Sequence, residues 1–396
     1  MDRSTVCARG PMRTESTSHP LAPPIDISTV YCLADLDHVD ALYDGAAKGF
    51  IYARDAHPNA GQLAEKMSRL EGGEAGLVCA SGMGAIASVF LSLLSQNDHA
   101  LISEGVYGKT SSLVSRQLTR WGIKHDVFDP ANAGAIKPLL NAKTRLIFVE
   151  TISNPLLRVA DLDSLAAIAR EAGIPLVVDN TFAPLICRPI ERGASLVVHS
   201  VTKMIGGHSD LTLGVVIGAR RMIEQIQTLA STLGQTGNPF ESWLALRGLA
   251  TLSLRMDRAC ASALELARQF EAHGQVGRVL YPGLPSHRDH LLASRQLTDG
   301  YGAMVTIDLG NRATAESFMR ALPSIPFAPS LGDVQTTLSH PATTSHRGQD
   351  DAQLARQGIT AGMIRLSVGL EDPDDLWREL RQALDASGPS RRPEEA

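Results

Sequence analysis

Seven short strand-like runs, most of them apolar and separated by stretches of helical periodicity, constrain the fold of this chain more than any other feature of its sequence. The runs are Gly76–Ala80, Ala100–Ser103, Lys124–Phe128, Leu146–Glu150, Leu176–Asp179, Leu196–His199 and Leu213–Ile217. The helical stretches between them include Gln62–Leu70, Tyr107–Trp121 and Leu162–Ala172. Strands that are apolar along their whole length are buried on both faces, as in parallel sheets that helices cover on both sides. The alternation therefore predicts an α/β fold with a mostly parallel seven-stranded sheet.

The C-terminal part of the chain has a different order of elements. A long helical stretch at Pro239–Ala272 comes first, and four short elements follow it: Ala303–Asp308, Ala313–Leu322, Ile364–Val368 and Pro373–Ala386. Mixed short strands and helices of this kind are typical of an α+β unit. We therefore expect an N-terminal arm over residues 1–56, a large domain over residues 57–254, and a smaller α+β domain over residues 255–396.

The composition excludes several classes of partner. The net charge is −5, the isoelectric point is near 6.2, and no run of Lys or Arg is longer than a pair. These values provide no basic surface for nucleic acid or an anionic membrane, so a small molecule is the expected partner. The five cysteines include no CxxC pair, and the first residues lack an apolar signal region. We therefore expect reduced thiols and a cytoplasmic location.

One uncharged segment, Ala75–Asn97, is long enough to suggest a membrane span. Its glycines at positions 76, 82 and 84 and its four serines favour a different interpretation. We expect a buried strand at Gly76–Ala80, a glycine turn, and a helix at Gly84–Ser95.

Two of the apolar runs end in residues that suit cofactor chemistry. Asp179 stands at the end of one run, and Ser200, Thr202 and Lys203 follow another. In parallel sheets, ligands bind at the carboxyl ends of the strands. An aspartate and a lysine in one cleft suit pyridoxal phosphate (PLP), because the carboxylate keeps the ring nitrogen protonated and the amine forms an imine. A salt bridge at the sheet edge is the alternative, but the hydroxyls of Ser200 and Thr202 favour a phosphate ligand.

A second element is the turn Ala80-Ser-Gly-Met-Gly84, which opens a helix. Free backbone N–H groups at a helix start bind anions, so Gly82 and Met83 are candidates for phosphate binding. The same residues match the loose dinucleotide pattern G-x-G-x-x-A at Gly82–Ala87, with Glu104 ending the next strand. An NAD-binding oxidoreductase is therefore an alternative, although it leaves the segment around Lys203 without a role.

Three further positions carry candidate ligand contacts. The pair Tyr52 and Arg54 suggests phosphate recognition, with an ordinary surface pair as the alternative. Tyr107 could stack on a planar cofactor or belong to the core. Arg365 lies in an apolar strand and needs an anionic partner, either a substrate carboxylate or an internal acid. His199, His208 and Asp210 match no metal motif, so no metal site is predicted.

At these residues the sequence resembles the Cys/Met-metabolism family of PLP enzymes, which includes cystathionine γ-synthase, cystathionine γ-lyase, methionine γ-lyase and the O-acylhomoserine sulfhydrylases. The resemblance runs from about Pro23 to Leu384. Its motifs are Tyr52-Ala-Arg54, Leu70-Glu-Gly-Gly-Glu74, Ala80-Ser-Gly-Met-Gly84, Tyr107-Gly108, Glu150-Thr-Ile-Ser-Asn-Pro155, Val178-Asp-Asn-Thr181, His199-Ser-Val-Thr-Lys203, Gly207-His-Ser-Asp210, Ser330-Leu-Gly-Asp333, His340-Pro-Ala342 and Arg365-Leu-Ser-Val-Gly-Leu-Glu371.

The resemblance implies the fold of aspartate aminotransferase, known as fold type I, and a set of roles. It implies three catalytic residues: Lys203 carries the cofactor and moves protons, Asp179 pairs with the ring nitrogen, and Tyr107 stacks on the ring and acts on the leaving group. It implies that the phosphate is held by Gly82, Met83, Ser200 and Thr202. Asn154 lies near the ring hydroxyl, and Ser330 and Arg365 bind the substrate carboxylate.

The resemblance also implies an oligomer. Tyr52 and Arg54 would reach the phosphate of a neighbouring subunit, so the arm would contact that subunit and at least a dimer is required. A homotetramer built from two such dimers is the expected assembly.

The implied reaction removes the group on Cγ of a sulfur-containing or O-acylated homoserine-derived L-amino acid. Motifs Gly207–Asp210 and Ser330–Asp333 look like methionine γ-lyase and favour γ-elimination. The segment His340–Ser345 also looks like the homoserine sulfhydrylases, so γ-replacement stays open, and an inactive scaffold of the same fold is a further alternative. His57, Asn59, Lys109 and Gln335 depart from the family pattern, and Gln335 weakens the case for a cystathionine substrate.

Overall fold

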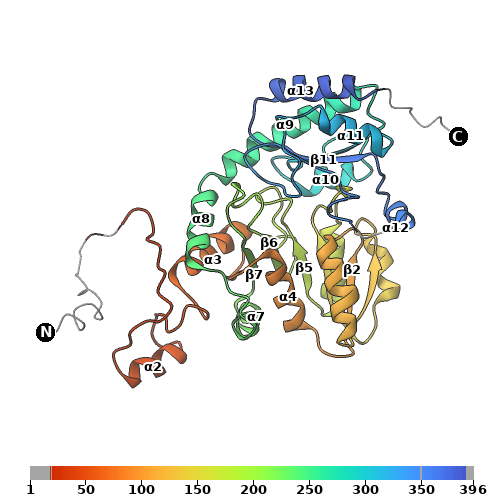
Figure 1. Cartoon of the computed structure of the whole chain (residues 1–396). Coiled ribbons are helices and arrows are strands. Elements are labelled where there is room, and N and C mark those ends of the chain that lie inside the picture. The colour runs from red at the N-terminus through yellow and green to blue at the C-terminus, as the bar shows by residue number, and fades with distance from the viewer. Residues whose placement is uncertain (1–17, 19, 348–349, 389–396) are drawn as a thin grey trace.

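The larger of two sheets dominates the computed structural model, which describes residues 18, 20–347 and 350–388 (Figure 1). Its strands are β1 (Ala75–Cys79), β2 (His99–Ser103), β3 (Lys124–Phe128), β4 (Thr144–Glu150), β5 (Leu176–Asp179), β6 (Leu196–Ser200) and β7 (Gly214–Gly218). They lie in the order β1-β7-β6-β5-β4-β2-β3, and only β7 runs antiparallel to its neighbours. The predicted mostly parallel seven-stranded sheet is therefore confirmed.

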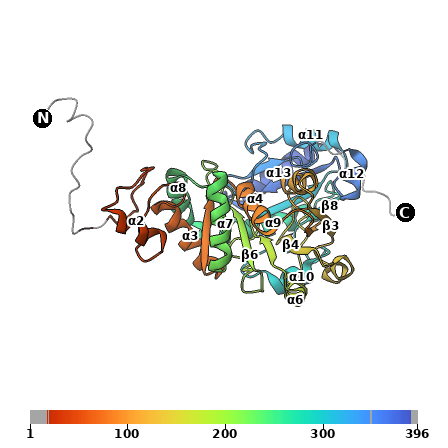
Figure 2. The ribbon, with the colours of Figure 1, turned by 90° about the horizontal axis from the view of Figure 1, so that it is seen from below.

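Helices cover both faces of this sheet (Figure 2). They are α3 (Pro58–Glu71), α4 (Gly82–Leu93), α5 (Gly108–Ser112) with a π-helix at Leu113–Leu118, a 3-10 helix at Ala133–Leu139, α6 (Leu162–Ala172), α7 (Arg220–Leu233) and α8 (Pro239–Leu249). Alternate residues of β5 face different apolar clusters: Val177 packs in the cluster of α4 and α7, whereas Val178 packs in that of α3, α6 and α8. This two-sided burial explains why the inner strands are largely apolar, whereas the edge strand β3 carries Lys124, His125 and Asp126 and is mostly exposed.

A smaller antiparallel sheet follows along the chain. Its strands are β8 (Arg278–Leu280), β9 (Met304–Asp308), β10 (Thr337–Ser339) and β11 (Met363–Ser367), in the order β10-β11-β9-β8. The helices of this part are α9 (Leu252–Ala272), α10 (His290–Gln296), α11 (Arg312–Arg320), α12 (Asp351–Arg356) and α13 (Pro373–Ala386). A separate apolar cluster joins this sheet to α9, α11 and α13, as the sequence pattern predicted for an α+β unit.

The predicted continuous helical stretch Pro239–Ala272 is wrong in one respect. The structure divides it into α8 and α9, because Thr251 leaves helical geometry with φ −112° and ψ 7°. The two helices run in different directions, and α9 extends from the large sheet to the small one (Figure 1).

The N-terminal arm projects from the body in both views (Figure 1, Figure 2). It contains α2 (Leu36–Tyr43) and an isolated bridge between Val30 and Tyr52. Residues 1–17 and 19 of the predicted arm lie outside the described residues. Asn59 attaches the arm to α3, because its side chain accepts from Asp26 N at 2.9 Å and donates to Pro24 O at 2.8 Å. This departure from the family pattern therefore holds the arm.

The topology removes two of the alternatives. Residues 75–97 form β1, a turn and α4, and within the described residues no helix is long and apolar enough to cross a membrane. A dinucleotide fold needs adjacent parallel strands around its glycine turn. Here β1 pairs with antiparallel β7, and β2 lies five positions away in the sheet order. The dinucleotide interpretation of Gly82–Ala87 is therefore wrong.

Candidate cofactor and substrate site

The carboxyl ends of β4, β5 and β6 bring the first group of candidate residues together. Glu150 stands opposite Asp179 in the register of β4 and β5. Thr181 links β5 to β6: its N–H and hydroxyl donate to Asp179 Oδ1 at 3.0 and 2.5 Å, and its hydroxyl accepts from Ser200 N at 2.8 Å. Sequence reasoning gave no role to Thr181 or Glu150. The strand-end position of Glu150 was the available signal.

Both carboxyl groups at these strand ends are buried. Burial raises the pKa of Glu150 well above its ordinary value, and the charge of Asp179 raises it further, whereas the N–H of Tyr107, which donates to Glu150 Oε1 at 2.6 Å, acts in the opposite direction. Burial also raises the pKa of Asp179, but the two bonds from Thr181 oppose the rise. Asp179 is therefore the better placed of the two to stay ionised, with Glu150 holding a proton.

The start of α4 forms a second wall of the site. Ser81 caps the helix by accepting from Gly84 N at 2.9 Å. A Cβ on Gly82 would lie 2.8 Å from Ser200 Cβ, so only glycine allows this close approach. The helix start and Ser200 therefore adjoin, as phosphate binding requires.

Two of the predicted phosphate contacts have partners inside the protein. The hydroxyl of Thr202 donates to Leu213 O at 3.2 Å and accepts from Leu213 N at 3.1 Å. The sulfur of Met83 accepts from the hydroxyl of Thr110 at 3.8 Å. The backbone N–H groups of Gly82 and Met83 are separate from these bonds, so their predicted role does not depend on the side chains.

Lys203 lies where the two sheets meet. Its Nζ donates to Ser330 Oγ at 3.2 Å, across from the large sheet to the loop before β10. Burial lowers the pKa of Lys203 from its ordinary value, and the positive charge of Arg365 lowers it further. Gly332, with φ +80°, permits the approach, because a Cβ there would lie 2.5 Å from Met204 N.

Arg365 projects into the same region from β11. Its Nη1 donates to Asn154 Oδ1 at 2.7 Å and its Nη2 to Ser330 O at 2.9 Å, while Nε is buried without a hydrogen-bond partner in the described part of the chain. Burial lowers the pKa of Arg365 to about 10. Within the described residues no carboxylate forms an ion pair with this guanidinium, so the internal acid that the sequence left open is absent there.

His346 is a further buried group near this arginine that the sequence did not indicate. Burial and the charge of Arg365 lower the pKa of His346 to about 4, so its ring is neutral near pH 7. Its Nδ1 lies 2.9 Å from Ser345 Oγ. The backbone O of Ser345 in turn approaches Gly108 so closely that a Cβ there would lie 2.6 Å from it.

The structure does not bring Tyr52 and Arg54 to this site within one chain. They lie in the arm, where the Arg54 guanidinium stacks 5.0 Å from the centre of the Tyr52 ring and the tyrosine is 38% exposed. Tyr107 is 39% exposed and directly precedes α5, with Lys109 exposed beside it.

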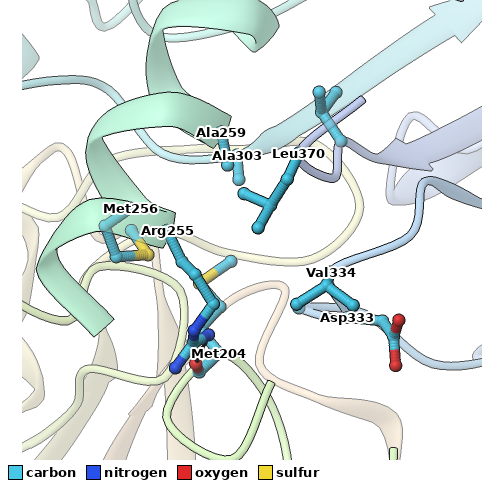
Figure 3. Close-up of a pocket in the computed structure, with 10 residues that line it drawn as sticks. Met204, Arg255, Met256, Ala259, Ala303, Asp333, Val334 and Leu370 are labelled. Carbon is cyan, nitrogen blue, oxygen red and sulfur yellow. Dashed lines mark hydrogen bonds between the residues drawn. The ribbon is translucent and has the colours of Figure 1, made fainter. Parts of the chain in front are cut away.

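A small cavity lies behind the Lys203 turn and is distinct from the site. Arg255 and Met256 of α9 line it together with Met204 and Val334 (Figure 3). Its volume of about 20 Å³ has room for about one water molecule. The cavity is too small for a cofactor.

The donor set fits PLP. A buried carboxylate, a partly buried amine of lowered pKa and a helix start lie at the carboxyl end of the large sheet. An arginine that has no ion-pair partner among the described residues approaches them from the small sheet. In contrast, His199 bonds to Glu71 and His208 to Gly206 O, and within the described residues no group of three or more His, Cys, Asp or Glu could hold a metal ion.

Comparisons with known proteins bear on the family of the chain. Residues 4–385 match the family model described as Cys/Met metabolism PLP-dependent enzyme. The chain is 39% identical over 371 residues to the L-methionine gamma-lyase of Pseudomonas putida, covering 93% of each chain. It is 40% identical over 348 residues to the O-succinylhomoserine sulfhydrylase of Pseudomonas aeruginosa, covering 87% of this chain and 86% of that one.

Solved structures give the same result. The cystathionine gamma synthase of Xanthomonas oryzae pv. oryzae superposes with a TM-score of 0.89 at 33% sequence identity, covering 94% of this chain and 95% of that one. The fold and the family that the sequence predicted are therefore confirmed. This chain belongs to the Cys/Met metabolism family of PLP-dependent enzymes.

Proposed function

We propose that this enzyme catalyses γ-elimination on a sulfur-containing or O-acylated homoserine-derived L-amino acid, giving a 2-oxo acid, ammonia and, for a sulfur substrate, a thiol. The observation that carries the proposal is the bond from Lys203 Nζ to Ser330 Oγ at 3.2 Å, with Arg365 bonded to Ser330 O at 2.9 Å. An amine for proton transfer and a cation for a carboxylate thus lie in one site.

Bound PLP would act as the electron sink at Cα, and the residues that would hold it are Asp179, Asn154, Ser200, Thr202, Lys203 and the N–H groups of Gly82 and Met83. Tyr107 would stack on its ring. Tyr52 and Arg54 of a neighbouring subunit would complete the phosphate site, and we propose a tetramer made of two such dimers.

Lys203 would first remove the proton from Cα and would then take part in removing the proton from Cβ. Its lowered pKa increases the fraction of neutral amine near neutral pH, which is the form that accepts a proton. The Cγ–S bond then breaks, and Tyr107 would protonate the leaving thiolate. Water releases the remaining carbon skeleton as the 2-oxo acid and ammonia.

Arg365 and Ser330 would hold the substrate carboxylate. Among the described residues the guanidinium hydrogen-bonds to neutral oxygens only, so a carboxylate would supply the missing negative charge. The Asn154 contact orients the guanidinium from the large sheet. Binding therefore requires both sheets.

A second candidate reaction is γ-replacement, in which a thiol attacks Cγ after the leaving group departs. Two similarities support it. The sequence identity to the sulfhydrylase of Pseudomonas aeruginosa is about the same as that to the methionine γ-lyase, and the structure superposes on a cystathionine gamma synthase. The same residues serve both reactions. The choice therefore depends on whether water or a thiol reacts with the carbon skeleton after the bond between Cγ and the leaving group has broken.

The experiment that tests the proposal is incubation of the PLP-loaded enzyme with L-methionine, L-cystathionine and an O-acyl-L-homoserine, each with and without sulfide. We expect 2-oxobutyrate and ammonia without added thiol. A product that forms only when sulfide is present would replace γ-elimination by γ-replacement. No product from any of the three would reject both reactions.

A further inference from the structure

Three residues stand directly behind the site, on the opposite face of the large sheet. Each is the sequence neighbour of a strand-end residue of the site: Thr151 follows Glu150, Asn180 follows Asp179, and His199 precedes Ser200. Successive side chains of a strand point to opposite faces. Each pair therefore places one side chain in the site and the other behind it.

The three rear side chains form one network with Glu71, the last residue of α3. His199 Nε2 lies 2.6 Å from Glu71 Oε1, and Asn180 Nδ2 donates to the same oxygen at 3.1 Å. Thr151 Oγ1 donates to Asn180 Oδ1 at 2.7 Å. We refer to Glu71, Thr151, Asn180 and His199 as the polar clasp. It ties the ends of β4, β5 and β6 to one helix end.

The clasp is buried among apolar side chains. The side chains of His199 and Glu71 are 0% and 4% exposed, and Thr151 and Asn180 are fully buried. A buried ionic or polar group carries a desolvation cost that apolar side chains of similar volume avoid. Packing alone therefore does not require the clasp. Its directional bonds add a fixed spacing between three strand ends, which apolar contacts do not set.

The clasp also acts on the site through charge. Burial raises the pKa of Asp179, and the charge of His199 opposes that rise from behind the sheet. The backbone continues the connection, because Thr151 N donates to Asp179 O at 3.0 Å and Asn180 N to Val198 O at 2.9 Å. The backbone position of Asp179 thus depends on residues of the opposite sheet face, and His199 adds a smaller electrostatic contribution to those of burial and Thr181.

We propose that the polar clasp positions Glu150, Asp179 and Ser200 for the cofactor, with His199 and Glu71 as its central pair. The inference rests on the proposed function, since it concerns residues proposed to face PLP. The clasp residues are positioning residues, and they do not touch the cofactor or substrate.

The test compares three single substitutions in the full-length protein, two at His199 and one at a second buried histidine, His99. His199→Leu removes the ring nitrogen that bonds Glu71, whereas His199→Gln keeps an N–H donor at a similar distance from the backbone. His99→Leu is the matched control, because His99 is also buried and bonds Thr144 Oγ1 at 2.9 Å, but at the amino end of the same sheet. PLP affinity, the visible circular dichroism of bound PLP and thermal unfolding without PLP are measured for each.

We expect His199→Leu to weaken PLP binding by about tenfold or more, the size of effect that loss of orienting contacts has at metal sites, and to change the visible circular dichroism. We expect His199→Gln to restore most of both. His99→Leu should lower the unfolding temperature without changing either cofactor signal. Unchanged PLP affinity and spectrum in folded His199→Leu would overturn the inference, as would equal cofactor effects in the His99→Leu control.

Thr151→Val keeps the experiment decisive if His199→Leu does not fold. This substitution preserves side-chain volume and removes only the donor to Asn180 Oδ1. We expect a smaller weakening of PLP binding, about two- to tenfold, corresponding to one lost hydrogen bond. Unchanged binding would overturn the inference. A wild-type protein that binds no PLP would instead reject the proposed function, so the two failures are distinguishable.

Discussion

Four ionisable side chains of the site, Glu150, Asp179, Lys203 and Arg365, share a buried environment that disfavours charge. Burial raises the pKa of the two acids and lowers that of the two bases. A buried acid and base of this kind are commonly found where protons are transferred. The shifted pKa values of these four side chains therefore arise from the protein itself and do not require a ligand.

Substitution of Lys203 tests the proposed proton transfer at this scale. Lys203→Ala should reduce kcat by at least about 10²–10⁴-fold, the usual contribution of a general base, and should abolish covalent attachment of PLP. Turnover and reduction of the bound cofactor with borohydride would measure the two effects. Lys66→Ala, at an exposed position of α3, is the control. Near-normal turnover in Lys203→Ala would contradict the mechanism.

Arg365 allows a second prediction, about substrate binding. Arg365→Ala should lower kcat/KM by about 10–100-fold, mainly through a higher KM, because a charge-assisted contact contributes about 1.5–3 kcal/mol. Steady-state kinetics on the preferred substrate would show this, with exposed Arg268→Ala of α9 as the control. An unchanged KM would argue that the carboxylate binds elsewhere.

Glu150 predicts a pH dependence of stability. Its raised pKa means that the folded state holds a proton that the unfolded chain releases at lower pH, so this group lowers stability as pH rises from the ordinary pKa towards the raised one. Glu150→Gln imitates the protonated form. We expect this variant to unfold at a higher temperature than wild type at neutral and alkaline pH, and the advantage to vanish at acid pH.

Thermal unfolding of the apoprotein across pH provides the measurement for Glu150→Gln. Glu224→Gln, an exposed position on α7, should leave the pH dependence as it is. A variant that is less stable than wild type at every pH would show that Glu150 is ionised in the folded protein.

Among the elements, α9 connects the turn that follows Lys203 to the small sheet. Arg255 in its first turns donates to Met204 O at 2.5 Å, Ile205 O at 3.1 Å and Gly248 O at 2.8 Å. The guanidinium thus holds the residues that directly follow Lys203. Burial lowers the pKa of Arg255. Within the described chain no carboxylate hydrogen-bonds to this cation, and the three carbonyl contacts stabilise it instead.

Arg255→Leu should destabilise the protein by about 3 kcal/mol, because buried carbonyls lose their donors at roughly 1–3 kcal/mol each with partial compensation by water. Urea unfolding gives this value. Arg268→Leu on the exposed side of the same helix should change stability by less than about 0.5 kcal/mol. Equal effects of the two substitutions would show that the contacts of Arg255 add nothing to stability.

At the scale of elements, local patterns could be predicted and long-range pairings could not. The expected bounds of β3, β5, α6 and α13 match the structure, because each has a clear period and a defined end. The three-residue strands β8 and β10 were missed, since they are too short to show alternation. The position of antiparallel β7 between β1 and β6 depends on pairing across the chain, which a local pattern does not contain.

The site shows the same division. Asp179 and Ser200 end apolar strands and Lys203 follows one, so their shared edge could be predicted from the sheet. The bond between His199 and Glu71 joins residues 128 positions apart, and Glu71 lies in a helix that carries no local sign of it. The roles given to individual residues remain predictions.

At the scale of the whole molecule, the arm leads to the prediction that each site contains residues of two subunits. If Arg54 acts on a neighbouring subunit, Arg54→Ala and Lys203→Ala affect different chains of each site. Unfolding and refolding an equal mixture of the two inactive variants should restore about a quarter of wild-type activity, because half of the dimers are hybrids and each hybrid has one intact site.

The control for this mixing experiment combines Lys203→Ala with Asp179→Ala, two changes in the same chain's part of the site. This mixture should regain no activity. Equal recovery in both mixtures, or none in the first, would contradict a contribution of Arg54 across the interface.

The bend at Thr251, where α8 ends and α9 begins, has a mechanical consequence. Helix α9, which begins there, packs against β8 and β9 of the small sheet, and β9 pairs with β11, so the direction of the chain at this bend bears on where Arg365 lies relative to Lys203. We therefore expect substitutions at this bend to change substrate affinity without replacing any residue proposed to contact the substrate.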